Sequence, residues 1–206
     1  MPLFPQISDK TNRKIENIFF GQSNKMIVNS LFNLETASRH LNSRIDLCSL
    51  YLKAASYNLI EGILLRMGLK AMPSHELDQI RNLRCMEDLI NVSIERALEC
   101  LGLERASKTS ITRSCRALKE ILKKGDDGYI IFSKIDYMLE HGLHTDCYYY
   151  LGKIGLSKIE SHYSNMPELY PKLINFTFDL NLDVSLNRKL LTTLTACCKK
   201  ILKIRI

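Results

Sequence analysis

Basic and hydroxyl side chains gather on one expected helix near the middle of the chain. In the segment SITRSCRALKEILKK, the apolar residues Ile111, Cys115, Leu118 and Leu122 fall within about 60° of one another at the helical rotation of roughly 100° per residue. This stripe is expected to dock on the preceding helix. The opposite face carries Thr109, Arg113, Arg116, Lys123 and Lys124, together with the acidic Glu120.

This face has the chemistry of a DNA-reading helix. Arginine can bind guanine through two hydrogen bonds, threonine can contact a thymine methyl group or a phosphate, and lysines near the helix end can contact phosphates. A solvated face of an ordinary surface helix is the alternative, because basic helix faces are common. The residues expected to contact DNA here are Lys108, Thr109, Ser110, Thr112, Arg113, Arg116, Lys119, Lys123 and Lys124.

The positive charge of the chain is concentrated in two segments. The 206 residues include 29 Lys and Arg against 22 Asp and Glu, a net charge of +7. Residues 101–125 hold +5 and the last 26 residues hold a further +5, so the rest of the chain is slightly acidic. Two local basic concentrations indicate surfaces that meet an anion, and nucleic acid is the commonest such partner.

The second basic segment is expected to form a C-terminal helix from Val184 onwards. Lys199, Lys200 and Lys203 lie beside an apolar stripe, where they can contact phosphate without reading bases. The stripe favours packing on the protein's own core. An amphipathic helix lying on a membrane surface is the alternative.

Helices are expected to position both segments, because the chain has only 9 Gly and 5 Pro. Apolar periodicity predicts two helices in residues 11–42 with a break near Gly21, and a long helix from Ser43 to a stop at Gly68. A later helix is expected to end at Gly102, just before the basic helix.

The period then changes from helix to strand. The short aromatic and β-branched runs Tyr129–Phe132 and Cys147–Tyr150 predict two antiparallel strands. Helix, polar turn, basic helix, turn and two strands is the order of a winged helix-turn-helix. The expected fold is mainly α, with a helical N-terminal region (residues 1–70), a winged helix-turn-helix with a short antiparallel hairpin (71–155) and a basic helical C-terminal region (156–206).

Part of the chain resembles a known family. The stretch ALECLGL from Ala97 and the stretch SKTSITRSCRAL from Ser107 are similar to a region of IncFII-type RepA plasmid replication initiators, where a short helix ending in glycine leads into a "SITR…RAL" helix. The segment NSRIDL from Asn42 resembles that family's "TSRFD" segment. Residues 129–151 stand in the place of its hairpin, with Cys147-Tyr148 near a similar cysteine-tyrosine pair. The resemblance spans roughly residues 40–155.

The resemblance implies a protein that binds double-stranded DNA at a plasmid origin and takes part in replication initiation. It implies host replication proteins as partners, and a homodimer is a further candidate assembly. The family usually continues with a long arginine-rich region, whereas this chain ends soon after ACCKKILKIRI. Both a shortened initiator and an accessory relative therefore stay open, and an all-helical protein-interaction or regulatory module is the alternative function. The resemblance assigns to the DNA-contacting helix Ser110, Ile111, Thr112, Arg113, Arg116, Ala117 and Leu118.

No pattern for catalysis, a metal or a cofactor is found. His141 and His144 lack the further ligands of a metal site, Tyr148–Tyr150 lack the histidine pair of a nicking enzyme, and phosphate-loop and nucleophile-elbow motifs are missing. The seven cysteines are scattered and never spaced C-x-x-C, which indicates reduced thiols. The N-terminus lacks a secretory layout and no long apolar run is present. We therefore expect a cytoplasmic protein that is not an enzyme and does not bind membranes.

Overall fold

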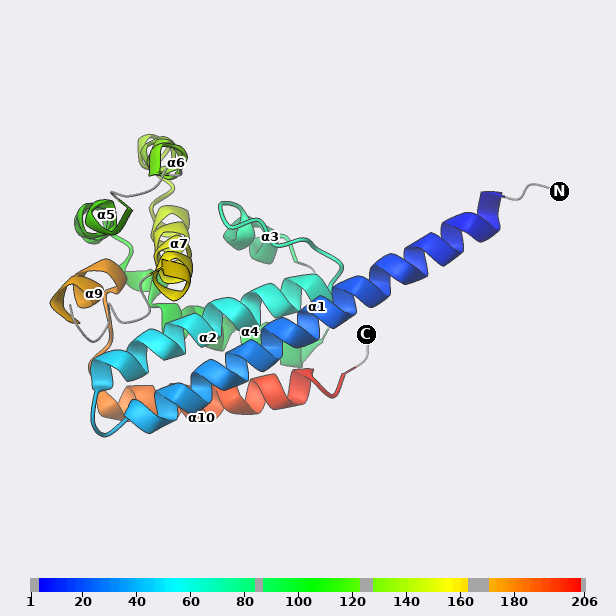
Figure 1. Cartoon of the computed structure of the whole chain (residues 1–206), viewed down its shortest axis with the longest axis horizontal. Helices are drawn as coiled ribbons and strands as arrows, with labels where there is room; N and C mark the ends of the chain where they lie inside the picture. The colour runs from blue at the N-terminus through cyan, green and yellow to red at the C-terminus, as the bar shows by residue number, and fades with distance from the viewer. Residues whose placement is uncertain (1–3, 84–86, 123–127, 163–170, 205–206) are drawn as a thin grey trace.

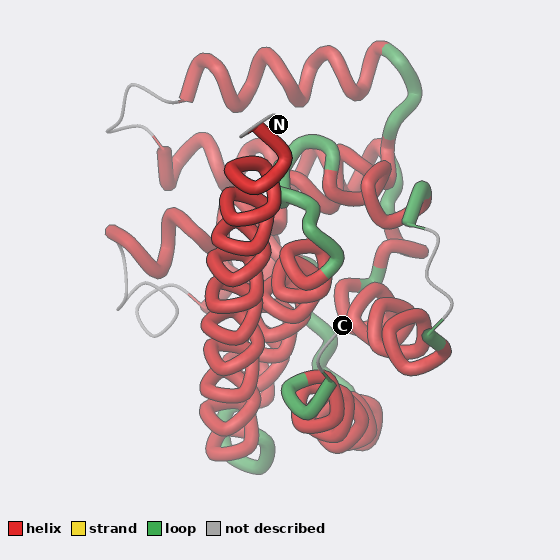
Figure 2. The backbone as a smooth tube through the Cα atoms, turned by 90° about the vertical axis from the view of Figure 1, so that its right-hand side faces the viewer, coloured by secondary structure: helices red, strands yellow, loops and turns green. Residues whose placement is uncertain are grey.

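The computed structural model describes residues 4–83, 87–122, 128–162 and 171–204. Every regular element in these ranges is helical, and Figure 2 shows helices joined by loops. The mainly α fold is therefore confirmed over the described residues. The elements are α1 (Phe4–His40), α2 (Ile45–Arg66), α3 (Glu76–Arg81), α4 (Asp88–Leu101), the 3-10 turn η1 (Leu103–Arg105), α5 (Lys108–Leu122), α6 (Gly128–Glu140), α7 (His144–His162), α9 (Pro171–Phe178) and α10 (Val184–Ile201).

Two long helices form the base of the molecule. α1 and α2 run antiparallel and pack closely, while the N-terminal end of α1 projects beyond the other helices (Figure 1). Small residues allow this close approach, since a Cβ atom on Gly62 would lie 2.7 Å from Ile27 Cγ1. The hydroxyl groups of Ser23 and Ser30 donate hydrogen bonds to backbone carbonyl oxygens of α2 at 2.7 and 2.8 Å. These bonds satisfy the hydroxyl groups of the small residues that the close packing buries.

α10 and α4 complete the lower layer. α10 packs against α1, α2 and α4, and its apolar stripe faces them, with Leu194 and Ile201 fully buried. The predicted packing of this stripe on the protein's own core is confirmed. The Asp183 carboxylate accepts hydrogen bonds from two backbone N–H groups of the first turn at 2.7 and 3.1 Å. This N-cap explains why the helix begins at Val184.

α7 is the centre of a second layer that lies over α2. It packs against α5, α6, α9 and α2 (Figure 1). All five residues from Cys147 to Leu151 are buried, so this part of the helix is covered on every side. The layer as a whole positions α5 at the edge of the molecule.

A buried polar network joins α3 to α7. Glu76 is fully buried, accepts a hydrogen bond from the Tyr149 hydroxyl at 2.7 Å and pairs with Lys153. Lys153 also lies 2.8 Å from the carboxylate of Glu61 on α2. Burial, with the Glu76 charge beside it, raises the pKa of Tyr149 well above its ordinary value. Tyr149 therefore stays a neutral hydrogen-bond donor.

The predicted wing is wrong. Tyr129–Phe132 lies in α6, and Cys147–Tyr150 lies in α7. The second run has no polar side to reveal a helical period, because neighbouring helices surround it. In the first run, Tyr129 and Ile130 are both exposed whereas Ile131 is buried, which is not the alternation of a half-buried strand.

Of the helix ends predicted from glycines, one is wrong and two are confirmed. The break near Gly21 is wrong, because α1 continues through it: one helical glycine costs only about 1 kcal/mol, and the packing on α2 offsets this. The stops at Gly68 and Gly102 are confirmed, and both glycines have positive φ, 74° and 72°. The turn expected after the basic helix falls in residues 123–127, which lie outside the described residues. The bounds of the three predicted regions stay a prediction.

Candidate nucleic-acid interface

α5 begins with a cap formed by two serines. The Ser107 hydroxyl accepts from the Ser110 N–H at 3.1 Å, and the Ser110 hydroxyl accepts from the Ser107 N–H at 2.9 Å. This is the exchange of a capping box, with serine in place of the usual Glu or Gln. Ser110 is buried, and its hydroxyl lies 2.9 Å from the Arg105 carbonyl oxygen. Ser110 therefore stabilises the start of α5 and does not face solvent.

The apolar stripe of α5 faces the core as predicted. Ile111 and Leu118 are fully buried and Cys115 is half-buried. The helix packs mainly against α7 and α9, whereas α4 packs mainly against α2 and α10. The predicted docking of this stripe on the preceding helix is therefore wrong. The left-handed backbone of Gly102 and the η1 turn separate the two helices and lead the chain into the other layer.

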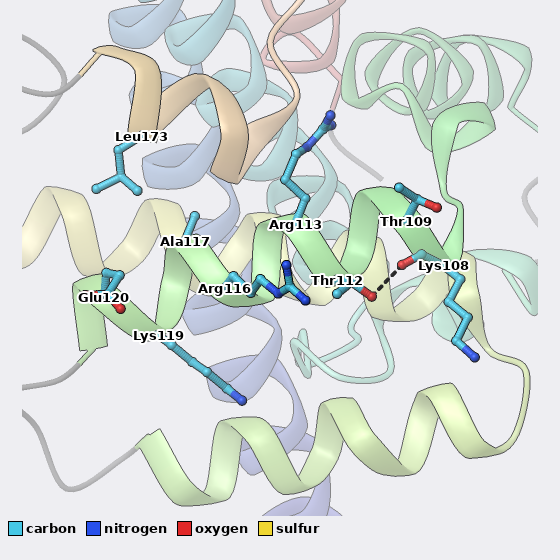
Figure 3. A pocket seen from close by; sticks show the side chains of 9 residues that line it. All are labelled: Lys108, Thr109, Thr112, Arg113, Arg116, Ala117, Lys119, Glu120 and Leu173. Atoms are coloured by element: carbon cyan, nitrogen blue, oxygen red, sulfur yellow. Dashed lines mark hydrogen bonds between the residues drawn. The ribbon is translucent and has the colours of Figure 1, made fainter.

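The opposite face of α5 is exposed and borders an open hollow of about 890 Å³. The Thr112 hydroxyl donates to the Lys108 carbonyl oxygen at 2.8 Å. Arg116 is exposed, and within the described part of the chain no hydrogen bond or ion pair holds its guanidinium. Figure 3 shows the residues that line the hollow, which are Lys108, Thr109, Thr112, Arg113, Arg116, Ala117, Lys119 and Glu120 of α5 and Leu173 of α9.

The hollow is rich in positive charge. Four of its lining residues are cationic and one, Glu120, is acidic. Lys119 Nζ lies 5.1 Å from the centre of the Phe132 ring on α6, which places this charge on the α6 side of the face. A surface of this kind attracts phosphate groups and other anions.

Asp179 reaches this face from the end of α9. One carboxylate oxygen lies 2.9 Å from Arg113 Nη2, the other lies 3.4 Å from Arg105 Nη1, and the Tyr148 hydroxyl donates to Asp179 at 3.4 Å. Sequence reasoning missed this residue. Arg113 and Asp179 are 66 positions apart, and no local pattern connects them.

The other predicted DNA contacts are not joined to this surface. Lys199, Lys200 and Lys203 are exposed at the C-terminal end of α10, which lies apart from α5 (Figure 1). These three lysines therefore do not extend the exposed face of α5. Lys123 and Lys124 lie outside the described residues.

The described residues also include histidines, tyrosines and cysteines that the sequence offers for other chemistry. No three His, Cys, Asp or Glu side chains among them gather as around a metal ion. The His141 ring stacks on Tyr137 with centroids 4.0 Å apart, and Tyr148–Tyr150 are buried inside α7. Burial raises the pKa of the Cys115 thiol to about 11, which keeps it protonated and unreactive at neutral pH. No described helix combines the length and the apolar character needed to cross a bilayer.

No protein-family model, curated protein or solved structure matches this chain. The resemblance to plasmid initiators therefore depends on the sequence segments alone.

Proposed function

We propose that this protein binds double-stranded DNA sequence-specifically through the exposed face of α5, and that it acts at a plasmid origin in replication initiation. The observation that best supports DNA binding is the division of α5 into two faces. The apolar face is anchored on α7 and α9, while the other presents cations and threonines to solvent. Because packing already fixes the backbone of α5, binding through its exposed face costs little backbone conformational entropy.

The exposed side chains suit the major groove. Thr109, Thr112 and Arg116 lie at positions i, i+3 and i+7, which form one ridge along a helix. The groove is about 12 Å wide and admits an α-helix. Arg116 can bind guanine O6 and N7, and the threonines can contact thymine methyl groups. Lys108 and Lys119 are placed to contact the flanking phosphates.

The proposed role at a plasmid origin rests on the resemblance of the "SITR…RAL" segment to plasmid replication initiators. Its matching residues fall in α5, which is the helix with the exposed cationic face. The proposal therefore includes host replication proteins as partners. It covers both an initiator and an accessory relative that binds the origin.

An acidic protein partner is the second candidate for the same surface. The observation that favours it is that apolar Ala117 and Leu173 also line the hollow, where a protein side chain can pack on them. Salt distinguishes the two candidates. Binding to DNA through several phosphates weakens steeply with salt, whereas a packed protein interface responds less.

The direct test compares Arg116→Ala with a matched control, Lys25→Ala. Lys25 is an exposed cation on α1, which belongs to the layer that does not contain α5 (Figure 1). Fluorescence anisotropy with plasmid fragments measures affinity over a range of salt concentrations. If Arg116 reaches a base edge, its removal weakens binding to the preferred fragment by about 1–3 kcal/mol, while Lys25→Ala has little effect.

Both variants should unfold at the same urea concentration as the wild type, because both side chains are exposed. Equal affinity of Arg116→Ala and wild type would show that α5 does not read DNA. Retention of one plasmid fragment above all others supports the origin role. Equal retention of all fragments would reduce the function to non-specific DNA binding.

A further inference from the structure

The two arginines on the exposed face of α5 differ in their surroundings. Arg113 Nη2 lies 2.9 Å from Asp179 Oδ1, whereas no described residue binds the guanidinium of Arg116. Asp179 also approaches Arg105, with 3.4 Å between Oδ2 and Nη1. Arg105 Nε also lies 3.6 Å from the Glu104 carboxylate, so two guanidinium groups meet two carboxylates here. Asp179 contacts one terminal nitrogen of Arg113, which keeps donors that Asp179 does not use.

The backbone holds Asp179 in place. Its φ of 49° is in the left-handed region, which Asp and Asn adopt more readily than other residues with side chains. The Asp179 N–H donates to the Asn175 carbonyl oxygen at 2.8 Å, and the Leu180 N–H donates to the Asn175 side chain at 3.2 Å. The carboxylate is therefore fixed beside α5 by the end of α9. Its side chain is only 23% exposed, so solvent screens it less than a free surface carboxylate.

We infer that Asp179 is a specificity-determining residue that disfavours phosphate binding by Arg113 and leaves this arginine for a base. The inference rests on the proposed DNA-binding function. A phosphate bound to Arg113 would lie within a few ångströms of the Asp179 carboxylate, and two negative charges at that distance repel each other. Guanine O6 and N7 are uncharged acceptors, so a guanine meets much less repulsion. Asp179 thus orients Arg113 and also disfavours its binding to phosphate relative to its binding to guanine.

Asp179→Asn tests the inference with little change of shape, because Asn suits the left-handed backbone. The probes are a random-sequence DNA duplex and the duplex that wild-type protein selects from a randomised pool. In the variant, Arg113 can take one more phosphate. Affinity for the random duplex is expected to rise about fivefold, and the slope of log affinity against log salt to steepen by about 0.9. The ratio of selected to random affinity should fall.

Two further variants separate this role from a simple change of charge. Glu120→Gln is the matched control, since it removes one negative charge from the same hollow. In an Arg113→Gln background, Asp179→Asn should leave the salt slope unchanged if Asp179 acts through Arg113. Asp179→Gly also suits the left-handed backbone and replaces Asp179→Asn if the latter loses its helical circular dichroism.

The outcomes are distinguishable. Unchanged random-duplex affinity and salt slope in Asp179→Asn, with wild-type protein binding DNA, would overturn this inference and leave the proposed function standing. An equal rise in Glu120→Gln would overturn it as well, because net charge would then explain the effect. Wild-type protein that shows no salt-dependent DNA binding would overturn both.

Discussion

Replacing the buried Lys53 by Met should stabilise the protein at neutral pH. Lys53 lies in α2 with only 3% of its surface exposed, and its ammonium donates a hydrogen bond to the Leu101 carbonyl oxygen at 2.6 Å. Nζ also lies 5.8 Å from the centre of the Tyr148 ring. No carboxylate forms an ion pair with Lys53 among the described residues, so the charge is buried with only weak compensation.

The size of the effect follows from the pKa of Lys53. Burial, and secondly the charge of Arg105, lower this pKa from 10.5 to about 8. At about 1.4 kcal/mol for each pH unit, the buried charge costs about 3 kcal/mol below pH 8. Removal of the hydrogen bond to the Leu101 carbonyl oxygen offsets about 1–2 kcal/mol of this. Lys53→Met should therefore raise the free energy of unfolding by about 1–2 kcal/mol at pH 7.

The pH dependence gives the sharper test. The folded-state pKa is the lower one, so the unfolded chain binds the extra proton between about pH 8 and 10.5. The free energy of unfolding of the wild type therefore rises relative to that of Lys53→Met as the pH increases through this window, and the greater stability of the variant disappears. Comparing the two proteins cancels the titration of the groups that both contain and that Lys53 does not influence. Cys100 is the exception, because the charge of Lys53 acts to lower its pKa.

Urea unfolding followed by far-UV circular dichroism, with reductant present, measures both free energies between pH 7 and 10.5. Lys25→Met, at an exposed position of α1, is the control and should change stability little at any pH. A destabilised Lys53→Met at pH 7, or a difference from wild type that is constant with pH, would refute the reasoning.

Two further predictions concern glycines and the C-terminal lysines. Gly21→Ala should stabilise the protein by about 0.5–1 kcal/mol, because no packed neighbour lies within 4 Å of the new Cβ in α1. Gly152→Ala should destabilise the protein by about 2 kcal/mol. Its new Cβ would overlap the Tyr57 hydroxyl and break the hydrogen bond from this hydroxyl to the Tyr149 carbonyl oxygen. Their melting temperatures should move in opposite directions, and a shift of the same sign would contradict this. Reversing the charge of Lys199, Lys200 and Lys203 should flatten the salt slope for specific and random DNA by about 0.9 for each phosphate that these lysines neutralise in the wild type, and an unchanged slope would restrict the DNA-binding surface to α5.

Periodicity predicted what depends on the immediate neighbours of a residue. Ile111 and Leu118 share one side of a helix in any packing, so their burial and the exposure of Arg116 follow from spacing alone. The end of α4 at Gly102 was predicted for the same reason, since a left-handed residue that ends a helix favours glycine whatever surrounds it.

The predicted wing failed where periodicity carries no information. Cys147–Tyr150 is apolar on every side because α7 is the centre of a layer, and a short buried run reads equally well as strand or helix. Aromatic and β-branched residues then favoured the strand, although such propensities are weak beside tertiary packing.

The sequence by itself determined that the fold is mainly helical, that α5 has two different faces, and that α10 has an apolar stripe. Only the tertiary structure decided that α5 docks on α7 and α9, that Asp179 holds Arg113, and that the C-terminal end of α10 lies apart from α5. The physical reason is the distance along the sequence between the residues that determine each feature. A helix face is set by residues three or four positions away, whereas the ion pair joins residues 66 positions apart that meet only after both layers have packed.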